Sequence, residues 1–363
     1  GFNGERSVMK RINIKNVAEI AQVSISTVSR VLNHSANVSD ELKSRVYKAI
    51  EETKYSVNPI ASTLKSARRN QIAIVLPSLK QTFYTDIIKG LSDYCCGKQI
   101  TPIILETSGK VKKEIEIAEN LEKQWVDGIV FIPSKNAHTP GYLEFIDSLR
   151  RLRKQDSNIP VVLAECDGLS DALDCVRVDY ETAFYKMTYH LLEIGRKRVA
   201  YLSCPGTSSL YDLCGQAYRQ ALADWGEPVR EELTECAEYT ILEGYHAMKR
   251  LLSREPEVDG VVCCNDQVAS GALHALKESG MQNADKVALV GFGGVAMSII
   301  TTPSITTMIA PRYELGCRAA QLLLDRINGK MGEPEKLILP SHMAIRASTL
   351  RTARKDLESM FEE

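Results

Sequence analysis

From residue 71 to residue 290 the sequence alternates short apolar segments with amphipathic ones. The apolar runs, typical of buried strands, fall at 72–76, 101–105, 128–132 and 161–164, and then at 175–178, 198–203, 260–264 and 287–290. Helical patterns separate them, at 86–96, 112–124, 182–194, 215–225, 245–252 and 268–279. Strands that alternate with helices favour parallel sheets covered by helices. The sequence therefore predicts an α/β body of two similar lobes, one for each series of strands.

The loops that follow these strands are the candidate binding site. Ligands of open parallel sheets bind beyond the carboxyl ends of the strands. The loops at these ends are 77–84, 133–136, 164–168, 204–212, 264–267 and 291–296. We expect them to face a cleft between the lobes that takes a small molecule.

The segment before this body has the pattern of a helix-turn-helix. A first helix is predicted to begin after the cap Asn13 and to end near Gln22, with an apolar face made of Ile14, Val17, Ala18 and Ala21. A second helix can be capped by Ser24. Its inward face is predicted to hold Ile25, Val28 and Leu32, and its outward face Ser26, Thr27, Ser29 and Arg30.

A third helix is predicted to open at Ser39, with Asp40 and Glu41 in its first turn. Its buried side chains are expected to be Leu42, Val46, Ala49 and Ile50. Three such helices favour DNA binding, although periodicity alone is equally typical of a small bundle without that function.

Charge separates the two parts of the chain. Residues 1–70 hold twelve Lys or Arg and six Asp or Glu, so this segment carries a charge of +6, while the remainder carries −7. A basic segment on an otherwise acidic protein indicates a polyanionic partner, because phosphate contacts release condensed counterions. A solvated basic surface without a partner is the alternative.

The motifs of the chain resemble those of the LacI/GalR family of bacterial repressors. The resemblance is carried by V-A-E-I-A-x-V-S-x-S-T-V-S-R-V-L-N, V-S-D-E-L-K-S-R-V and K-Y-S-V-N-P-I-A-S-T-L-K, and further on by C-N-D-Q-V-A-S-G-A-L-H-A-L, V-A-L-V-G-F, T-P-S-I-T-T and I-R-A-S-T-L. It implies a type I periplasmic-binding-protein-like body in which the chain crosses between the lobes more than once.

The resemblance also implies a division into functional segments. They are a leader or cloning remnant at 1–11, a helix-turn-helix head at 12–57, a hinge helix and linker at 58–70, a two-lobed effector-binding and dimerisation domain at 71–350 and a charged tail at 351–363. Asn58 with the following proline reads as the start of the hinge helix. The resemblance implies that Leu64 inserts between base pairs in the minor groove, with Lys65 beside it. The alternative is a tethering linker in which the leucine has no role in binding DNA.

In the head, Arg30 is the first candidate for base contact, because an arginine can donate two hydrogen bonds to guanine. By resemblance Ile25 and Ser26 set much of the sequence preference, although Ile25 can equally be a core residue. Thr27, Ser29 and Asn33 are expected to contact phosphates or to be structural.

The resemblance assigns residues to the effector cleft as well. They are the aromatic residues Phe83 and Tyr84, the acid Glu165 and the amide Asn265, to which we add Tyr239 as a further wall. Two departures from the family pattern enlarge the site: Cys214 stands at the arginine position, and Gly293-Gly294 replaces the usual acid. We therefore expect a disaccharide, a glycoside or another bulky sugar, with Gly293 allowing close backbone approach.

Each of these assignments has a structural alternative. Phe83 and Tyr239 can be core residues, and Asp266 can cap the next helix. Arg312 could meet an anion, or lie on the surface or at a dimer contact.

The remaining features narrow the class of protein. We find no apolar stretch long enough to span a membrane and no signal peptide, and expect a cytoplasmic protein. The ten cysteines have no metal-ligand spacing and are expected to be buried thiols. No catalytic motif points to an enzyme, and no cofactor is expected.

The sequence thus predicts a homodimeric repressor that binds a pseudo-palindromic duplex DNA operator under control of a small molecule, most simply a sugar. A solute-binding protein of a sugar transporter is the alternative, against which the basic head argues.

Overall fold

The computed structural model describes residues 13–32, 38–53, 69–121, 126–134, 141–154, 159–166, 173–203, 209–281 and 285–350, together with Thr352 and Met360. The chain divides into two compact units, residues 1–69 and residues 70–363. We call the first the head and the second the body.

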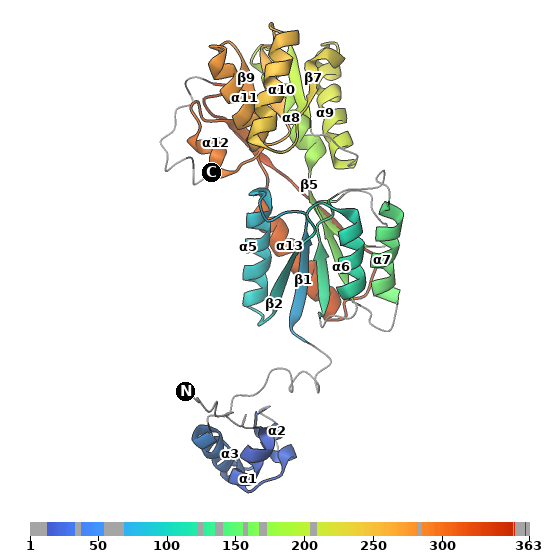
Figure 1. The fold of residues 1–363 in the computed structure, drawn as a ribbon, viewed down its shortest axis with the longest axis vertical. Coiled ribbons are helices and arrows are strands. Elements are labelled where there is room, and N and C mark those ends of the chain that lie inside the picture. Colours follow the sequence, from blue (N-terminus) through green and yellow to red (C-terminus); the bar gives the residue numbers. More distant parts are fainter. Residues whose placement is uncertain are drawn as a thin grey trace, which may run out of the picture. The chain divides into compact units, whose positions relative to one another are not determined.

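The head contains three helices, α1 (Ile14–Ala21), α2 (Ile25–Leu32) and α3 (Asp40–Thr53) (Figure 1). The predicted caps are confirmed. The side-chain oxygen of Asn13 accepts hydrogen bonds from the backbone of Lys15 and Asn16, and Ser24 Oγ accepts one from the backbone nitrogen of Thr27 at 3.1 Å. α1 ends at Gln22, whose φ of 50° is left-handed. The core is made of Val17, Ala18, Ala21, Val28, Val31, Val38, Val46 and Ala49.

One prediction for the head is wrong. Ile25, placed on the inward face of its helix, is 43% exposed, and Val31 is buried. Ile25 is the first residue of an eight-residue helix, and the apolar stripe that packs against the other helices begins one turn later, at Val28.

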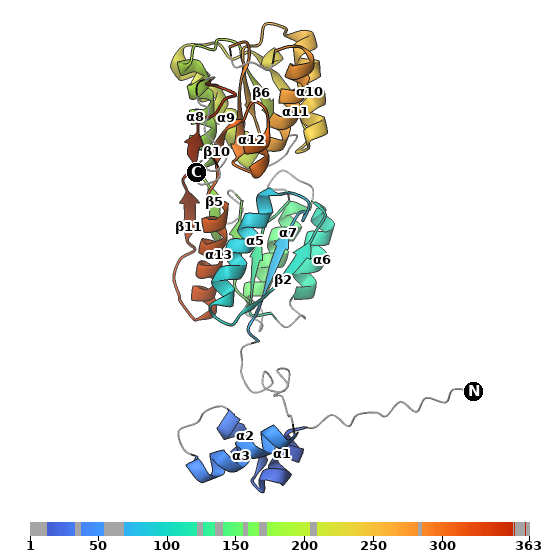
Figure 2. The ribbon, with the colours of Figure 1, turned by 90° about the vertical axis from the view of Figure 1, so that its left-hand side faces the viewer.

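The first lobe of the body is built on a parallel sheet of six strands in the order β11-β5-β4-β3-β1-β2. Its strands are β1 (Gln71–Leu76), β2 (Thr101–Glu106), β3 (Gly128–Phe131), β4 (Val161–Ala164), β5 (Asp174–Val178) and β11 (Lys336–Leu339). The helices of this lobe are α5 (Phe83–Cys96), α6 (Val111–Leu121), α7 (Tyr142–Lys154) and α13 (Arg312–Ile327). α5 and α13 cover one face of the sheet, and α6 and α7 cover the other (Figures 1 and 2).

The second lobe repeats this plan, with strands in the order β12-β10-β9-β8-β6-β7. Its strands are β6 (Val199–Ser203), β7 (Thr234–Cys236), β8 (Gly260–Cys263), β9 (Ala288–Gly293), β10 (Thr306–Ile309) and β12 (His342–Ala344), of which only β12 is antiparallel to its neighbour. Its helices are α8 (Tyr180–Glu193), α9 (Ser209–Trp225), α10 (Ile241–Arg254), α11 (Asp266–Glu278) and the short α12 (Ala296–Ile300), with a 3-10 turn at Glu231–Leu233.

The chain passes between the lobes three times, after β5, after β10 and after β11. More than one crossing was implied by the family resemblance and is confirmed. One prediction is corrected, because the strand at 175–178 was assigned to the second lobe and β5 belongs to the first sheet, between β4 and β11. A buried strand has the same apolar pattern in either sheet, so the sequence does not show where the chain crosses between the lobes.

Among the helices of the described part, none is both long and apolar enough to cross a membrane. Five of the described cysteines are buried as predicted, but Cys96 and Cys236 are exposed.

Candidate functional site

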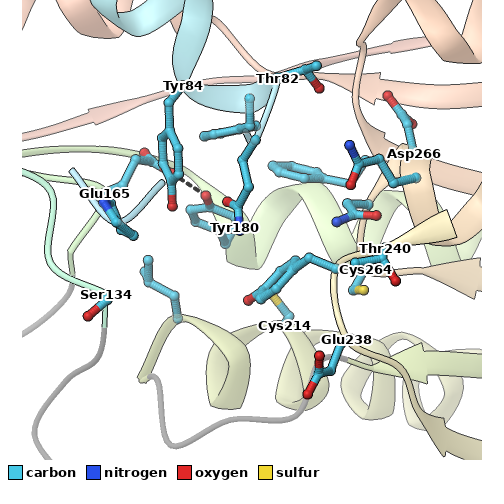
Figure 3. Close-up of a pocket in the computed structure, with 18 of the residues that line it drawn as sticks. Thr82, Tyr84, Ser134, Glu165, Tyr180, Cys214, Glu238, Thr240, Cys264 and Asp266 are labelled. Carbon is cyan, nitrogen blue, oxygen red and sulfur yellow. Dashed lines mark hydrogen bonds between the residues drawn. The ribbon is translucent and has the colours of Figure 1, made fainter. Parts of the chain in front are cut away.

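The body contains a cavity of about 700 Å³ lined by residues of both lobes (Figure 3). All six loops that the sequence placed at the cleft contribute to it: examples are Pro77, Pro133, Glu165, Leu210, Cys264 and Val295. That prediction is confirmed, since the carboxyl ends of the strands of both sheets face the same space. The sequence analysis missed Ser108 and Gly109, although they follow β2 and the same rule would have found them.

Aromatic side chains form a continuous wall of this cavity. Phe83 and Tyr84 lie in the first turn of α5, with ring centroids 5.8 Å apart. The ring centroid of Phe292, at the end of β9, lies 6.4 Å from that of Phe83, 5.1 Å from that of Tyr180 and 5.4 Å from that of Phe184. The alternative of a core position for Phe83 is partly right, because this half-buried side chain packs against the core and lines the cavity as well. Tyr239 is also half-buried, and lines the second lobe's side.

Glu165 follows β4 in a left-handed conformation with a φ of 53°, which is uncommon for a residue other than glycine. Its carboxylate accepts a hydrogen bond from the hydroxyl of Tyr180 (Figure 3). It accepts another from the backbone nitrogen of Val178 at 3.0 Å. Burial raises the pKa of Glu165 to about 7, although these two bonds and the charge of Arg177 oppose the rise. The carboxyl is therefore partly protonated near neutral pH.

Tyr180, which orients Glu165, was missed by the sequence analysis. It is the first residue of α8 and follows the cap Asp179, whose carboxylate accepts a hydrogen bond from the backbone of Thr182. The loop after the strand at 175–178 was not counted among the loops of the cleft, although the rule that found the other six applies to it as well.

Asn265 and Asp266 lie side by side at the start of α11 and have different roles. Asn265 Oδ1 accepts a hydrogen bond from Val268 N at 2.7 Å and caps the helix. The suggestion that Asp266 is the cap is therefore wrong. Asp266 instead accepts hydrogen bonds from Thr307 Oγ1 at 2.6 Å and Val295 N at 2.8 Å, and burial raises its pKa to about 6. Both residues line the cavity.

The structure gives Gly293 another role than backbone contact with a ligand. Its neighbours Phe292 and Val295 are the ones that line the cavity. Gly293 has a φ of 122°, and its carbonyl accepts a hydrogen bond from Arg312, which also donates to the Gly294 carbonyl at 3.3 Å. Gly294 is required by packing, because a Cβ there would meet Ile309 at 2.8 Å.

Arg312 connects the lobes. Its guanidinium donates to Asp86 Oδ2 at 2.9 and 2.7 Å, and its side chain is only 10% exposed. Asp86 belongs to the first lobe and the two glycine carbonyls belong to the second. Arg312, for which an anion contact or a surface position was considered, therefore forms a bridge between the lobes.

Cys214 lies in the cavity wall on α9. The side chain is buried, and burial raises the pKa of its thiol well above the usual range. The position that the family resemblance matched to an arginine thus holds a short, neutral group.

In the head, Ile25, Ser26 and Arg30 are exposed on α2, and Thr27 and Ser29 are half-buried. Ser24 Oγ lies 2.7 Å from the hydroxyl of Ser26 and 2.8 Å from that of Thr27, so these three side chains organise the start of the helix. The other four predicted DNA contacts, Asn33, Asn58, Leu64 and Lys65, lie outside the described residues.

A helix-turn-helix unit joined in one chain to a two-lobed α/β unit with an interlobe cavity defines a class, the ligand-binding transcriptional regulators. Comparison with known families places the chain within this class. Residues 13–58 match the family described as bacterial regulatory proteins, lacI family, and residues 69–347 match the periplasmic binding proteins and sugar binding domain of the LacI family. The chain belongs to the LacI family.

Relatives are similar over nearly the whole chain. The HTH-type transcriptional regulator RegA of Clostridium saccharobutylicum is 30% identical over 339 residues, which cover 93% of this chain and 99% of that protein. A structure of the transcriptional regulator CelR in complex with cellobiose has a TM-score of 0.69 at 27% identity, and the match covers 93% of this chain and all of that one. The lac repressor dimer bound to operator shares the fold, with a TM-score of 0.83 at 22% identity, over 94% and 100% of the two chains.

Proposed function

We propose that the protein is a homodimeric repressor whose affinity for a pseudo-palindromic operator is set by a disaccharide or glycoside bound between the lobes. The observation that carries the ligand part is the cavity. Its volume of about 700 Å³ lies within the usual range for small-molecule sites, and rings from both lobes offer flat apolar faces to a sugar. Cys214 leaves room where the family pattern has an arginine.

Cellobiose in the CelR structure is a disaccharide, which supports a ligand of this size. The match of the head to bacterial regulatory proteins favours a regulator over a solute-binding protein of a transporter. Carbohydrate recognition would use Phe83, Tyr84 and Tyr239 as walls, with Glu165 and Asn265 orienting hydroxyls.

The proposed mechanism is a coupled equilibrium. Residues 58–70 would order as a hinge on DNA, and a ligand that prefers one arrangement of the lobes would change that order by its differential affinity and no more. A coupling of 1–3 kcal/mol would change operator affinity about 5- to 150-fold.

The DNA-binding part is tested with Arg30→Ala. If Arg30 reads a guanine, the variant should lose about 1–3 kcal/mol of discrimination between operator and scrambled duplex, measured by fluorescence anisotropy at fixed salt. Lys48→Ala is the matched control, because it removes one exposed positive charge from α3. This control should weaken binding to both duplexes to the same extent, if it weakens binding at all. Unchanged discrimination in Arg30→Ala would refute the assignment.

The ligand part is tested by calorimetry of the full chain with cellobiose and with glucose, followed by operator titration at saturating ligand. We expect the disaccharide to bind more tightly and to change operator affinity at least about fivefold. A saturated protein with unaltered operator affinity would contradict the mechanism.

A further inference from the structure

We propose that the effector is cationic, an amine-bearing saccharide and not a neutral one. This inference rests on the proposed function, because it names the chemistry of the ligand for the same cavity.

Among the described residues, the charges at the cavity are of one sign. The described residues that line it include three carboxylates, Glu165, Glu238 and Asp266, and no lysine, arginine or histidine. A fourth carboxylate lies just behind the wall, where Glu114 accepts a hydrogen bond from the backbone nitrogen of the lining residue Ser134 at 2.7 Å. Glu114 is 1% exposed. A ligand in this cavity therefore meets acidic groups in a medium of low dielectric constant, with Glu165 ionised only in part near neutral pH because burial raises its pKa to about 7.

The two arginines whose charges act on Glu165 and Asp266 already have partners. Arg177 forms a bidentate pair with Glu181, with both distances at 2.8 Å, and Arg312 pairs with Asp86 at 2.7 Å. Each arginine is shared with a carboxylate outside the cavity wall, so its charge offsets that of Glu165 or of Asp266 only in part. The family's arginine position, which would place a cation in the wall, is occupied by the neutral Cys214.

The rest of the wall suits an ammonium group. Seven of the described residues that line the cavity are aromatic: Phe83, Tyr84, Tyr180, Phe184, Tyr201, Tyr239 and Phe292. The faces of such rings are negative and attract ammonium groups, most strongly where water is excluded. Aromatic faces together with carboxylates are the chemistry that recognises an organic cation, and they repel phosphates and carboxylates.

Two of the acids are placed for different tasks. Both oxygens of Glu165 are held, one by Val178 and the other by Tyr180, so this carboxylate is a fixed feature of the wall. Glu238 is exposed at the other side of the cavity (Figure 3). No ion pair of Glu238 is found among the described residues, which leaves its carboxylate available to a ligand.

The test uses three β-1,4-linked disaccharides with the same skeleton and different groups at carbon 2. Cellobiose carries hydroxyls, the glucosamine dimer carries ammonium groups, and the N-acetylglucosamine dimer carries neutral amides. The titrations are made at pH 7, because burial raises the pKa of Asp266 to about 6 and that of Glu165 to about 7, and both carboxyls would be largely protonated in more acidic solution. Calorimetry of the full chain should show the glucosamine dimer binding at least about tenfold more tightly than either neutral analogue, equivalent to ~1.4 kcal/mol.

Glu238→Gln removes one cavity charge at an exposed position and should fold normally. We expect it to reduce the preference for the glucosamine dimer over cellobiose by about two- to fivefold. Glu257→Gln, an exposed acid of the same lobe that does not line the cavity, is the matched control and should leave the preference intact.

The outcomes separate the two proposals. If cellobiose binds as tightly as the glucosamine dimer, the cationic effector is refuted while the disaccharide site stands. If an acidic analogue such as cellobiuronic acid binds most tightly, the sign of the charge is wrong. If none of these sugars binds, the carbohydrate part of the proposed function falls together with this inference.

Discussion

At the residue scale, Glu165 combines an uncommon backbone conformation with a buried carboxylate beside a cavity. A non-glycine residue with positive φ is held in place only by its surroundings, here by the hydrogen bonds from Val178 and Tyr180. Perturbed carboxylates of this kind concentrate at functional sites. The same features make the stability of the body dependent on pH.

The folded-state pKa of Glu165, about 7, lies above its ordinary value of 4.5, so the folded protein binds more protons than the unfolded chain between these values. The stability associated with this group is therefore complete below about pH 4.5 and is lost as pH rises to about 7. Glu165→Gln should be more stable than the wild type above pH 7, by up to about 3 kcal/mol, with the difference vanishing in acid.

Urea unfolding at a series of pH values measures this difference. Glu257→Gln, which changes an exposed carboxylate, should follow the wild-type curve. Parallel curves for Glu165→Gln and wild type would contradict the argument. Some pH dependence should remain in Glu165→Gln, because burial also raises the pKa of Asp266 to about 6.

Five of the six residues expected at the effector site line the cavity, four of them assigned by the family resemblance and Tyr239 added to these. Gly293 was the exception. Its carbonyl is taken by Arg312, which is 19 residues away, and long-range hydrogen bonds leave no signal in local sequence. The cap formed by Asn265 was equally open to Asp266, since both residue types favour that position.

At the scale of elements, the closest helix contact of the first lobe depends on glycines. A Cβ on Gly90 of α5 would lie 2.0 Å from the carbonyl oxygen of Tyr313, and one on Gly316 of α13 would lie 2.1 Å from that of Ile87. These are backbone atoms of the facing helix and cannot move aside. α5 and α13 therefore pack almost backbone to backbone.

Gly90→Ala should force the two helices apart and lower the free energy of unfolding by about 1–3 kcal/mol or more. Gly97→Ala, at the end of the same helix with a φ of −63° and open space around it, should change stability by less than about 0.5 kcal/mol. Thermal or urea unfolding compares the two variants. Equal stability of both would show that the crossing tolerates a methyl group.

This contact illustrates what the apolar pattern leaves out. Helices and strands were predicted where their periodicity was strong, including α6 and β4. α13 was not predicted. The glycines that let it approach α5 lower the helix propensity of the sequence, so they do not indicate a helix contact. The edge strands β7, β11 and β12 were not predicted, because most of their side chains are exposed or half-buried and they lack the continuous buried apolar run of β4.

At the scale of the whole body, Arg312 is the side chain that holds lobe to lobe at the cavity. It bridges Asp86 in α5 to the carbonyls of Gly293 and Gly294 after β9, and its guanidinium carbon lies 5.9 Å from the ring of Phe83. A ligand that touches Phe83 or Phe292 therefore acts on residues that this bridge positions.

A double-mutant cycle measures the coupling free energy between Arg312 and Asp86. Arg312→Gln and Asp86→Asn should each destabilise the body, and the double variant should lose less than the sum, with a coupling of about 1 kcal/mol because Asp86 is half-exposed. Arg318→Gln with Glu314→Gln, an exposed pair on the solvent side of α13, is the control and should show almost no coupling. Additive effects at Arg312 and Asp86 would show that the pair does not hold the lobes.

Because the chain passes between the lobes three times, both lobes are completed only late in translation. The first lobe receives β11 only when the chain has been made as far as Leu339, and the second receives β12 only at Ala344. Neither lobe can thus be finished until nearly the whole chain has been made, and until then β5 and β10 each lack one neighbour. Unpaired strand edges attract other chains. We expect a nascent polypeptide of this topology to depend on chaperones more than two lobes encoded one after the other would.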